Sequence, residues 1–265
     1  MKITVPKTSG FCYGVSLAVK EAESVLKAGK SLIMYGEIVH NPDVVSDLER
    51  KGGRTVEELE QIGKDEVLDD TVLLIRAHGV SKQTHKKLVG TGAEVRDKAC
   101  PKVKKVQEIV SEEEKGRQIV IVGNPHHPEV IGILGQCEKE GATVIGSVFE
   151  AEEARLTGDI SVVVQTTFNG EVFERIKNIL VEKCPQAVIF NTMCPATNIR
   201  QQEISRLSEN ADGVIVLGGK KSSNSLKLCE IAGKNAPSEL VEKIGEIDLE
   251  KLRGKNNIVV CGGSS

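Results

Sequence analysis

The sequence predicts an α/β fold built from three related units of about 90 residues each. Short apolar runs rich in Val and Ile alternate with longer segments of helical pattern, which is typical of α/β proteins. The apolar runs are continuous, as expected for parallel strands that are buried on both faces. Three similar segments also begin at Cys12, Cys100 and Cys194, which are 88 and 94 residues apart.

We expect a strand wherever β-branched residues stand together between Gly, Asn or charged residues. In chain order, the expected strands are 2–5, 31–35, 71–75, 93–97, 118–122, 142–146, 161–165, 187–191, 213–217 and 257–261. Polar side chains follow many of these runs directly. Open α/β sheets bind ligands at the carboxyl ends of their strands, so these polar groups are candidates for a binding site.

We expect helices between the strands, where Lys and Glu interleave with apolar residues, as in KVKKVQEIVSEEEKGR. In chain order, the expected helices are 14–29, 42–52, 81–90, 101–116, 128–140, 171–182, 195–210, 223–235 and 238–251. Each of the three cysteines stands in the loop between a strand and a helix.

The repeat defines three α/β units and their boundaries. The units are 12–99, 100–193, and 194–265 together with 1–11. The segment KITV precedes Cys12 as similar runs precede the other two cysteines, so it is expected to complete the sheet of the third unit. That third unit is expected to be incomplete at its C-terminus, because nothing follows Ser265 to match the helices at 81–90 and 171–182.

Composition narrows the class of protein. A net charge of −3 and a pI near 6.0 give no general field for nucleic acid. The N-terminus shows neither a signal peptide nor a membrane span. Seven cysteines are an odd number without the dense spacing of a secreted disulfide framework. We therefore expect a cytoplasmic protein with reduced thiols and no membrane or nucleic-acid partner.

The repeated cysteines indicate a metal site, because a threefold repeat brings Cys12, Cys100 and Cys194 to one axis. Four thiolates usually hold a [4Fe–4S] cluster, and three leave one iron open to a substrate. Zinc is the competing metal, but structural zinc usually takes close C-x₂₋₄-C pairs, which this chain lacks. The remaining cysteines are expected to be small core residues: Cys137, Cys184, Cys229 and Cys261.

A ring of polar side chains is expected around these thiols. His40, His78 and His127 each follow an apolar run directly, and isolated histidines there would more often be structural. In GGKKSSNS, one helix cap would need only one of Ser222, Ser223 and Asn224, so a run of small donors favours anion binding at a helix N-terminus.

Two further groups belong to this ring. Glu129 is either a first-turn charge or a proton donor beside a metal-bound oxygen. Thr166 stands at the corresponding strand end of the second unit, and Ser264 and Ser265 at that of the third.

Nine motifs together give the chain a resemblance to a known family. They are GFCYGV, GEIVHN, RAHGVS, KACPKV, HHPEVIG, VVQTTF, MCPATNIRQ, GGKKSSNS and CGGSS. With these motifs the chain resembles the 4-hydroxy-3-methylbut-2-enyl diphosphate reductases, the last enzymes of the methylerythritol phosphate route to isoprenoids. The resemblance implies three α/β units in a pseudo-threefold arrangement around a central iron–sulfur cluster.

The resemblance also implies roles for individual residues. Cys12, Cys100 and Cys194 would be the ligands of a [4Fe–4S] cluster. Glu129 would be the proton source, and Thr166 would bond the substrate hydroxyl. The substrate diphosphate would be bound by His40, His78, His127, Ser222, Ser223, Asn224 and Ser265. The family's position favours Ser265, whereas the internal spacing favours Ser264.

The implied reaction is a reductive dehydroxylation that gives isopentenyl and dimethylallyl diphosphates. Its partners would be the small diphosphate substrate and an electron donor such as ferredoxin or flavodoxin. The family continues past this serine with a segment that helps to close the site. Three alternatives stay open: a three-cysteine [4Fe–4S] enzyme of the quinolinate synthase type, a non-catalytic iron–sulfur sensor, and a structural zinc protein.

Overall fold

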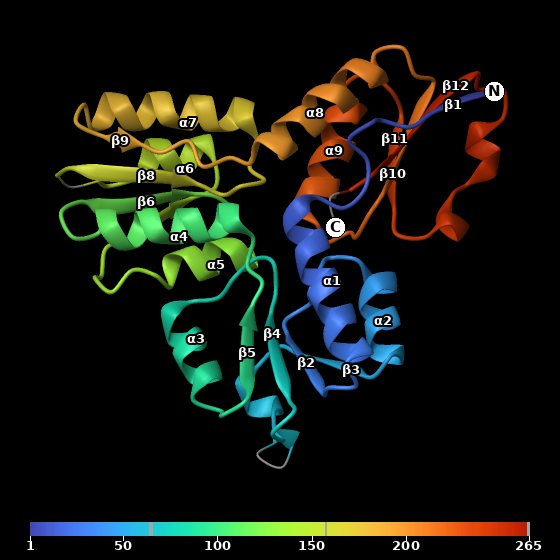
Figure 1. Cartoon of the computed structure of the whole chain (residues 1–265). Coiled ribbons are helices and arrows are strands. Elements are labelled where there is room, and N and C mark those ends of the chain that lie inside the picture. Colours follow the sequence, from blue (N-terminus) through green and yellow to red (C-terminus); the bar gives the residue numbers. More distant parts are fainter. Residues whose placement is uncertain (64–65, 157, 264–265) are drawn as a thin grey trace.

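The protein has an α/β fold with three four-stranded sheets placed around a common centre (Figure 1). The structure is a computed structural model and describes residues 1–63, 66–156 and 158–263. Every strand pairing in this part of the chain is parallel. The predicted α/β architecture of three sheet-centred units is thereby confirmed.

Each sheet has four parallel strands, and in two of the three sheets the central pair is longer than the outer strands. One sheet has the order β3 (Gly53–Val56), β2 (Leu32–Tyr35), β4 (Val72–Ile75) and β5 (Glu94–Asp97). The next has the order β7 (Thr143–Ile145), β6 (Gln118–Val122), β8 (Ile160–Val164) and β9 (Val188–Ile189). The third has the order β1 (Lys2–Thr4), β12 (Asn257–Gly262), β10 (Gly213–Leu217) and β11 (Ser238–Val241).

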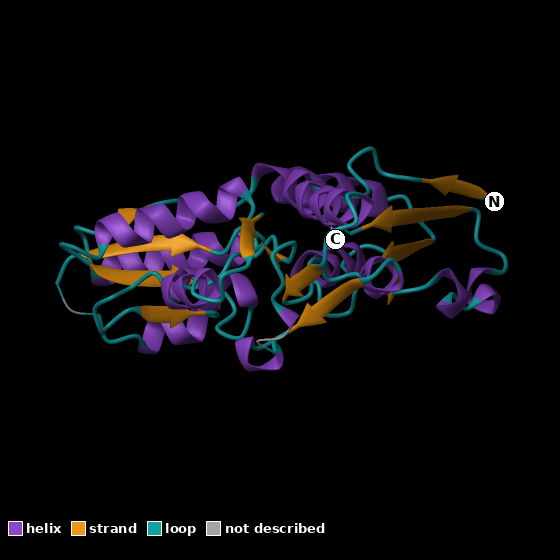
Figure 2. Ribbon diagram, turned by 60° about the horizontal axis from the view of Figure 1, so that its bottom comes forward, coloured by secondary structure: helices purple, strands orange, loops and turns teal. Residues whose placement is uncertain are grey.

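The helices lie between the strands and cover both faces of the sheets (Figure 2). They are α1 (Tyr13–Lys27), α2 (Pro42–Arg50), α3 (Lys82–Val89), α4 (Pro101–Glu113), α5 (Pro128–Leu134), α6 (Val148–Glu153), α7 (Gly170–Lys183), α8 (Pro195–Ser208) and α9 (Ser223–Gly233). None of the helices in the described ranges has both the length and the apolar character needed to cross a bilayer.

The strands are buried on both faces, as their continuous apolar sequences predict. In β6, Val120 and Val122 pack with α6 and α7, whereas Ile119 and Ile121 pack with α4 and α5. Figure 1 shows these two helix pairs on opposite sides of the sheet. Full burial of each such side chain contributes roughly 1.5–3 kcal/mol, so the strand ends that carry polar residues extend from a well-packed layer.

The first strand of the chain lies beside the last. In β1, Ile3 pairs with Ile258 of β12, so the N-terminal segment belongs to the same sheet as the final described strand (Figure 1). We propose that the three sheets are the cores of three units with the boundaries 12–99, 100–193, and 194–265 together with 1–11.

Four elements differ from the sequence prediction. The helix predicted at 238–251 is wrong, because Ser238–Val241 is the edge strand β11 and two short 3₁₀ turns follow it. The prediction also missed β3 (Gly53–Val56), an edge strand whose only buried residue is Val56. It missed α6, which is six residues long. Elements of four to six residues are too short to give a clear periodic signal.

The fourth difference is the length of α5, which ends at Leu134 instead of continuing to residue 140. Its C-cap, Gly135, lies against Ser81, whose Cβ would be 2.2 Å from a Cβ added at the glycine. The close approach of another segment, which no local pattern announces, therefore accompanies the end of the helix.

Candidate functional site

The three repeated cysteines lie at the N-termini of three helices. Cys12, Cys100 and Cys194 are the N-cap residues of α1, α4 and α8, and none of their side chains makes a capping hydrogen bond. All three line one cavity of about 80 Å³. Helix N-termini present unpaired N–H groups and a positive partial charge, which stabilise a bound anionic group. The fold therefore brings three metal-binding groups together in their favoured environment.

Backbone hydrogen bonds attach two of these cysteines to neighbouring strand ends. The Cys100 N–H donates to the Ala77 carbonyl at 2.9 Å, and the Cys194 N–H donates to the Thr166 carbonyl at 2.8 Å. Gly14 leaves room beside Cys100, because a Cβ at this glycine would lie 2.7 Å from the thiol sulfur. Burial raises the pKa of the Cys100 thiol, against the N–H groups of Lys102 and Val103, which lower it.

The arrangement of the thiols suits a cluster better than a single ion. Among the described residues, the group with three ligand atoms all within 4.8 Å of one another is the histidine group, and the three cysteines do not form such a group. One tetrahedral zinc ion draws its sulfur ligands to about 2.3 Å from the metal, which requires closer thiols. The cavity also holds the buried cation Arg200, whose Nη1 has no hydrogen-bond partner in the described part of the chain. Such a cation fits an anionic group held by the three thiolates.

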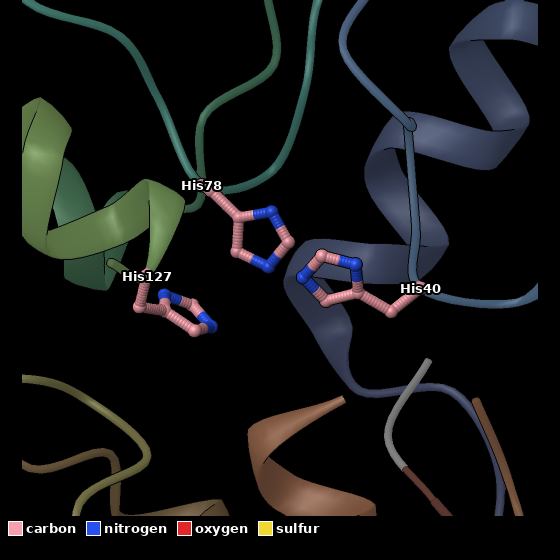
Figure 3. A group of neighbouring side chains, drawn as sticks. All are labelled: His40, His78 and His127. Carbon is pink, nitrogen blue, oxygen red and sulfur yellow. The ribbon is translucent and has the colours of Figure 1, made fainter. Parts of the chain in front are cut away.

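Three histidines also line this cavity, and their rings lie close together (Figure 3). The rings of His40 and His78 are stacked with centroids 4.5 Å apart, and His127 meets them edge-on at 5.9 and 5.2 Å. His40 follows β2, His78 follows β4, and His127 is the N-cap of α5. The structure thus places the three strand-end histidines next to one another.

The histidines are held in their neutral form. Burial lowers the pKa of His127 to about 4 and that of His78 well below its ordinary value, and the neighbouring rings and Arg76 act in the same direction. Burial also lowers the pKa of His40, although Glu37 opposes this effect. An anion in the cavity would reverse these shifts by stabilising the imidazolium form.

Hydrogen bonds fix which ring nitrogen of two histidines carries the proton. His127 Nδ1 accepts from the Glu129 N–H at 3.1 Å, so the neutral ring carries its hydrogen on Nε2. His40 Nδ1 lies 3.4 Å from the Glu37 carboxylate, which favours a hydrogen on that nitrogen. His40 Nε2 and His78 Nδ1 are buried without a partner among the described residues.

The tautomer of His127 favours anion binding over metal binding at this ring. The three rings are close enough together to hold an ion. However, a metal on His127 would have to replace its bond from the Glu129 backbone or remove the Nε2 hydrogen. An anion needs neither change, because an imidazole N–H donates to it directly and a second proton strengthens the contact.

A buried carboxyl and a buried hydroxyl form the next part of the site. Glu129 is 2% exposed, and its carboxyl oxygens accept from the Thr166 N–H at 2.6 Å and from the Thr166 hydroxyl at 2.8 Å. Burial raises the pKa of Glu129 to about 7, although both bonds oppose the shift. Near neutral pH the group therefore holds a proton part of the time, as a proton donor must.

The residues 222–224, called the SSN segment below, form another part of the cavity lining. Ser222 is the N-cap of α9, and Ser222, Ser223 and Asn224 all line the cavity. Both side-chain polar atoms of Asn224 are buried and lack a partner among the described residues. Gly219 allows the loop before α9 to pass close to the His40 backbone, because a Cβ at this glycine would lie 2.1 Å from the His40 carbonyl oxygen.

The structure brings together all but one of the residues predicted for the site. The cysteines, histidines, Glu129, Thr166 and SSN residues share one cavity. The predicted Ser265, and its alternative Ser264, lie outside the described residues.

Several residues that line the cavity were not predicted from the sequence, among them Gly14, Thr197 and Arg200. The sequence does contain a signal for Thr197 and Arg200. They share the buried face of α8 with Gln201 and Ile204, and these four residues recur at helical spacing. A polar group on the inward face of a helix is unusual, and it points to a site.

The raised pKa of Glu129 predicts how stability depends on pH. The unfolded chain releases this proton near pH 4.5 and the folded chain near pH 7, so stability falls as pH rises through that window. Glu129→Gln keeps a similar shape without the titration. Its stability relative to the original protein should therefore increase by about 3 kcal/mol between pH 4 and 8.

Urea unfolding of the metal-free protein at a series of pH values measures this difference. Glu140→Gln is the control, because Glu140 is exposed. A stability difference that does not change with pH would show that Glu129 titrates normally.

Comparison with known proteins places the chain in a family. A family profile described as "LytB protein" matches residues 3–265. The chain is 42% identical to the 4-hydroxy-3-methylbut-2-enyl diphosphate reductase of Caldanaerobacter subterraneus subsp. tengcongensis, over 100% of this chain and 92% of the relative. It is 35% identical to that of Clostridioides difficile, over 100% of this chain and 94% of the relative.

Solved structures agree with this assignment. The E-1-hydroxy-2-methyl-but-2-enyl-4-diphosphate reductase from Plasmodium falciparum superposes with a TM-score of 0.92 and 27% identity, covering 99% of this chain and 83% of that one. A second structure is titled as (E)-4-hydroxy-3-methyl-but-2-enyl diphosphate reductase, the terminal enzyme of the non-mevalonate pathway. It superposes with a TM-score of 0.70 and 31% identity, covering 99% of this chain and 94% of that one. With a profile match along nearly its whole length, the chain belongs to the LytB protein family.

Proposed function

We propose that this chain reduces 4-hydroxy-3-methylbut-2-enyl diphosphate to isopentenyl and dimethylallyl diphosphates. The relatives named above are reductases of this diphosphate. The observation that carries the proposal is one cavity lined by three helix-capping cysteines, three neutral histidines and a buried Glu129–Thr166 pair. Each reaction consumes two electrons and two protons, releases the hydroxyl oxygen as water, and leaves an alkene diphosphate.

The cofactor of the proposed enzyme is an iron–sulfur cluster, and we assign it as [4Fe–4S]. Cys12, Cys100 and Cys194 would hold it, because they share the cavity and each stands at the N-terminus of a helix. When bound, the cluster supplies single electrons and one open coordination position for an oxygen ligand. A ferredoxin or a flavodoxin suits the single-electron supply, and the cytoplasm is the expected compartment.

The histidines and the SSN segment are the proposed diphosphate site. His127 presents an Nε2 hydrogen, and Ser222, Ser223 and Asn224 contribute hydroxyl and amide donors around the N-terminus of α9. The unpaired polar atoms of Asn224 and His40 need a ligand or water to satisfy them. Bonds to a charged acceptor contribute roughly 1.5–3 kcal/mol each, so several donors offset the charge repulsion from nearby thiolates. Ser265 stays a predicted member of this set.

Glu129 and Thr166 are the proposed proton path. The Thr166 hydroxyl lies 2.8 Å from the Glu129 carboxyl, so the hydroxyl can receive a proton from the acid and donate one toward the cavity. The Thr166 N–H holds the other carboxyl oxygen at 2.6 Å and thereby fixes the orientation of the acid. Burial keeps the acid protonated near neutral pH, where an exposed carboxyl would already be ionised.

A quinolinate synthase-type enzyme and a non-catalytic iron–sulfur sensor are less well supported. A dicarboxylate substrate gives no reason for the meeting of three histidines with the SSN segment. A sensor gives no reason for an acid whose burial raises its pKa to about 7 beside a hydroxyl.

The ligand assignment is tested with single Cys→Ser variants at positions 12, 100 and 194. Each should lose most of its iron and its visible absorbance after anaerobic reconstitution, because a hydroxyl is a poor iron ligand. Cys184→Ser is the control, since Cys184 is partly buried away from the cavity in the core below α7. Full iron content in all three variants would contradict the assignment.

The proton path is tested with Glu129→Gln. The variant should bind cluster and diphosphate normally but turn over at least about 10²-fold more slowly, within the usual range for proton transfer. Turnover of the hydroxylated diphosphate with dithionite and a viologen measures the rate, with Glu140→Gln as the control. A variant rate within twofold of the original enzyme would reject the role of Glu129.

The diphosphate site is tested with inorganic pyrophosphate. Binding should take up protons at pH 7, because the histidines are neutral in the free site and an anion raises their pKa. Calorimetry in two buffers of different ionisation enthalpy measures this uptake. His40→Gln should weaken binding roughly 10- to 100-fold.

The matched control is His85→Gln, because His85 is exposed on α3. Equal affinity in the His40 and His85 variants would make His40 structural. Binding heats that do not depend on the buffer would show that the histidines gain no protons when the anion binds.

A further inference from the structure

Arg200 is a buried cation in the lining of the cavity. It lies six residues after Cys194 on α8, is 8% exposed, and lines the cavity together with the three thiols. The proposed proton path and diphosphate site do not use it. A buried charge needs a partner of opposite sign, because removal of an ion from water costs several kcal/mol.

The described part of the chain supplies no such partner. Arg200 forms no ion pair with a described carboxylate, and its Nη1 is buried without a hydrogen bond there. The carboxylate of Glu203, one turn further along α8, is occupied by the N–H groups of Lys7 and Thr8 and by the Thr8 hydroxyl. The described groups that remain as partners are therefore the cysteines that line the same cavity, which become negatively charged when they bind iron.

The electrostatic surroundings of Arg200 point to the cysteines. Burial lowers the pKa of its guanidinium, and Cys12 and Cys194 are the strongest influences in the opposite direction, ahead of Cys261 and Glu203. Arg76, a partly buried arginine near the histidines, differs because it pairs with Glu57 at 3.7 Å and influences the histidines. Lys102 lines the cavity but is exposed, so water already solvates it.

We propose that Arg200 is a positioning residue for charge: its guanidinium neutralises the thiolate-bound cluster and makes the cluster easier to reduce. This inference rests on the proposed cluster. Three thiolates around a [4Fe–4S]²⁺ core carry a net charge of −1, and one electron from an external one-electron donor makes it −2. A fixed positive charge in a dry site stabilises the second state more than the first.

The test compares Arg200→Met, which removes the charge, with Arg200→Lys, which keeps it. Arg206→Met, on the exposed side of the same helix, is the matched control. In anaerobic redox titrations of the reconstituted proteins, Arg200→Met should lose at least about tenfold in the equilibrium constant for one-electron reduction, a shift of about 59 mV. The Lys variant and the control should stay within about threefold of the original protein.

A second measurement separates charge from packing. In the cluster-free protein, Arg200 is an uncompensated buried cation, so Arg200→Met should raise the thermal unfolding midpoint. In the cluster-loaded protein, the same change should lower it. A residue that serves only to fill space would lower the midpoint in both forms.

The outcomes decide between the two proposals. An unchanged reduction equilibrium in Arg200→Met, or a lower midpoint in its cluster-free form, would overturn the role of Arg200 and leave the proposed function intact. If Arg200→Met assembles no cluster while Arg200→Lys does, the positive charge is required and the proposal stands. If neither variant assembles a cluster, the thermal unfolding midpoint of the cluster-free Arg200→Met protein decides. Failure of the original protein to bind iron would overturn the proposed function itself.

Discussion

The structure depends on the parallel direction of its strands. In a parallel sheet all carboxyl ends lie on one edge, and each following helix begins at that edge. Three such sheets placed around a centre direct several helix N-termini into one volume, including those of α1, α4 and α8. The backbone therefore offers unpaired N–H groups to the cavity before any side chain is considered. A volume of this kind favours negative charge.

Burial gives the side chains in this volume their protonation states. It lowers the pKa of the histidines and raises that of Glu129, so the resting site contains neutral bases and a neutral acid close together. The buried guanidinium of Arg200 cannot respond in this way, because arginine keeps its proton. The site thus combines groups that adapt their charge with one that does not, and this combination suits a ligand whose charge changes during a reaction.

Repetition made most of this site predictable from the sequence. The cysteines recur at nearly equal spacing, and strand-end histidines stand at matched distances from two of them. Residues that are far apart in the sequence could therefore be expected to lie close together in the fold. What escaped prediction lacks such a signal. The edge strands β3 and β11 have few apolar positions, and the end of α5 coincides with the approach of Ser81 to Gly135. Arg200 escaped because a charged residue in a polar helix resembles a solvated one until the packing is known.

Thr166 serves two neighbours through different atoms. Its carbonyl oxygen holds the Cys194 backbone, whereas its N–H and hydroxyl hold Glu129. Loss of the hydroxyl alone, as in a valine at this position, removes one contact to the acid and leaves the link to the ligand loop intact. A change confined to this side chain can therefore alter the proposed proton path while the main-chain link that positions Cys194 is kept.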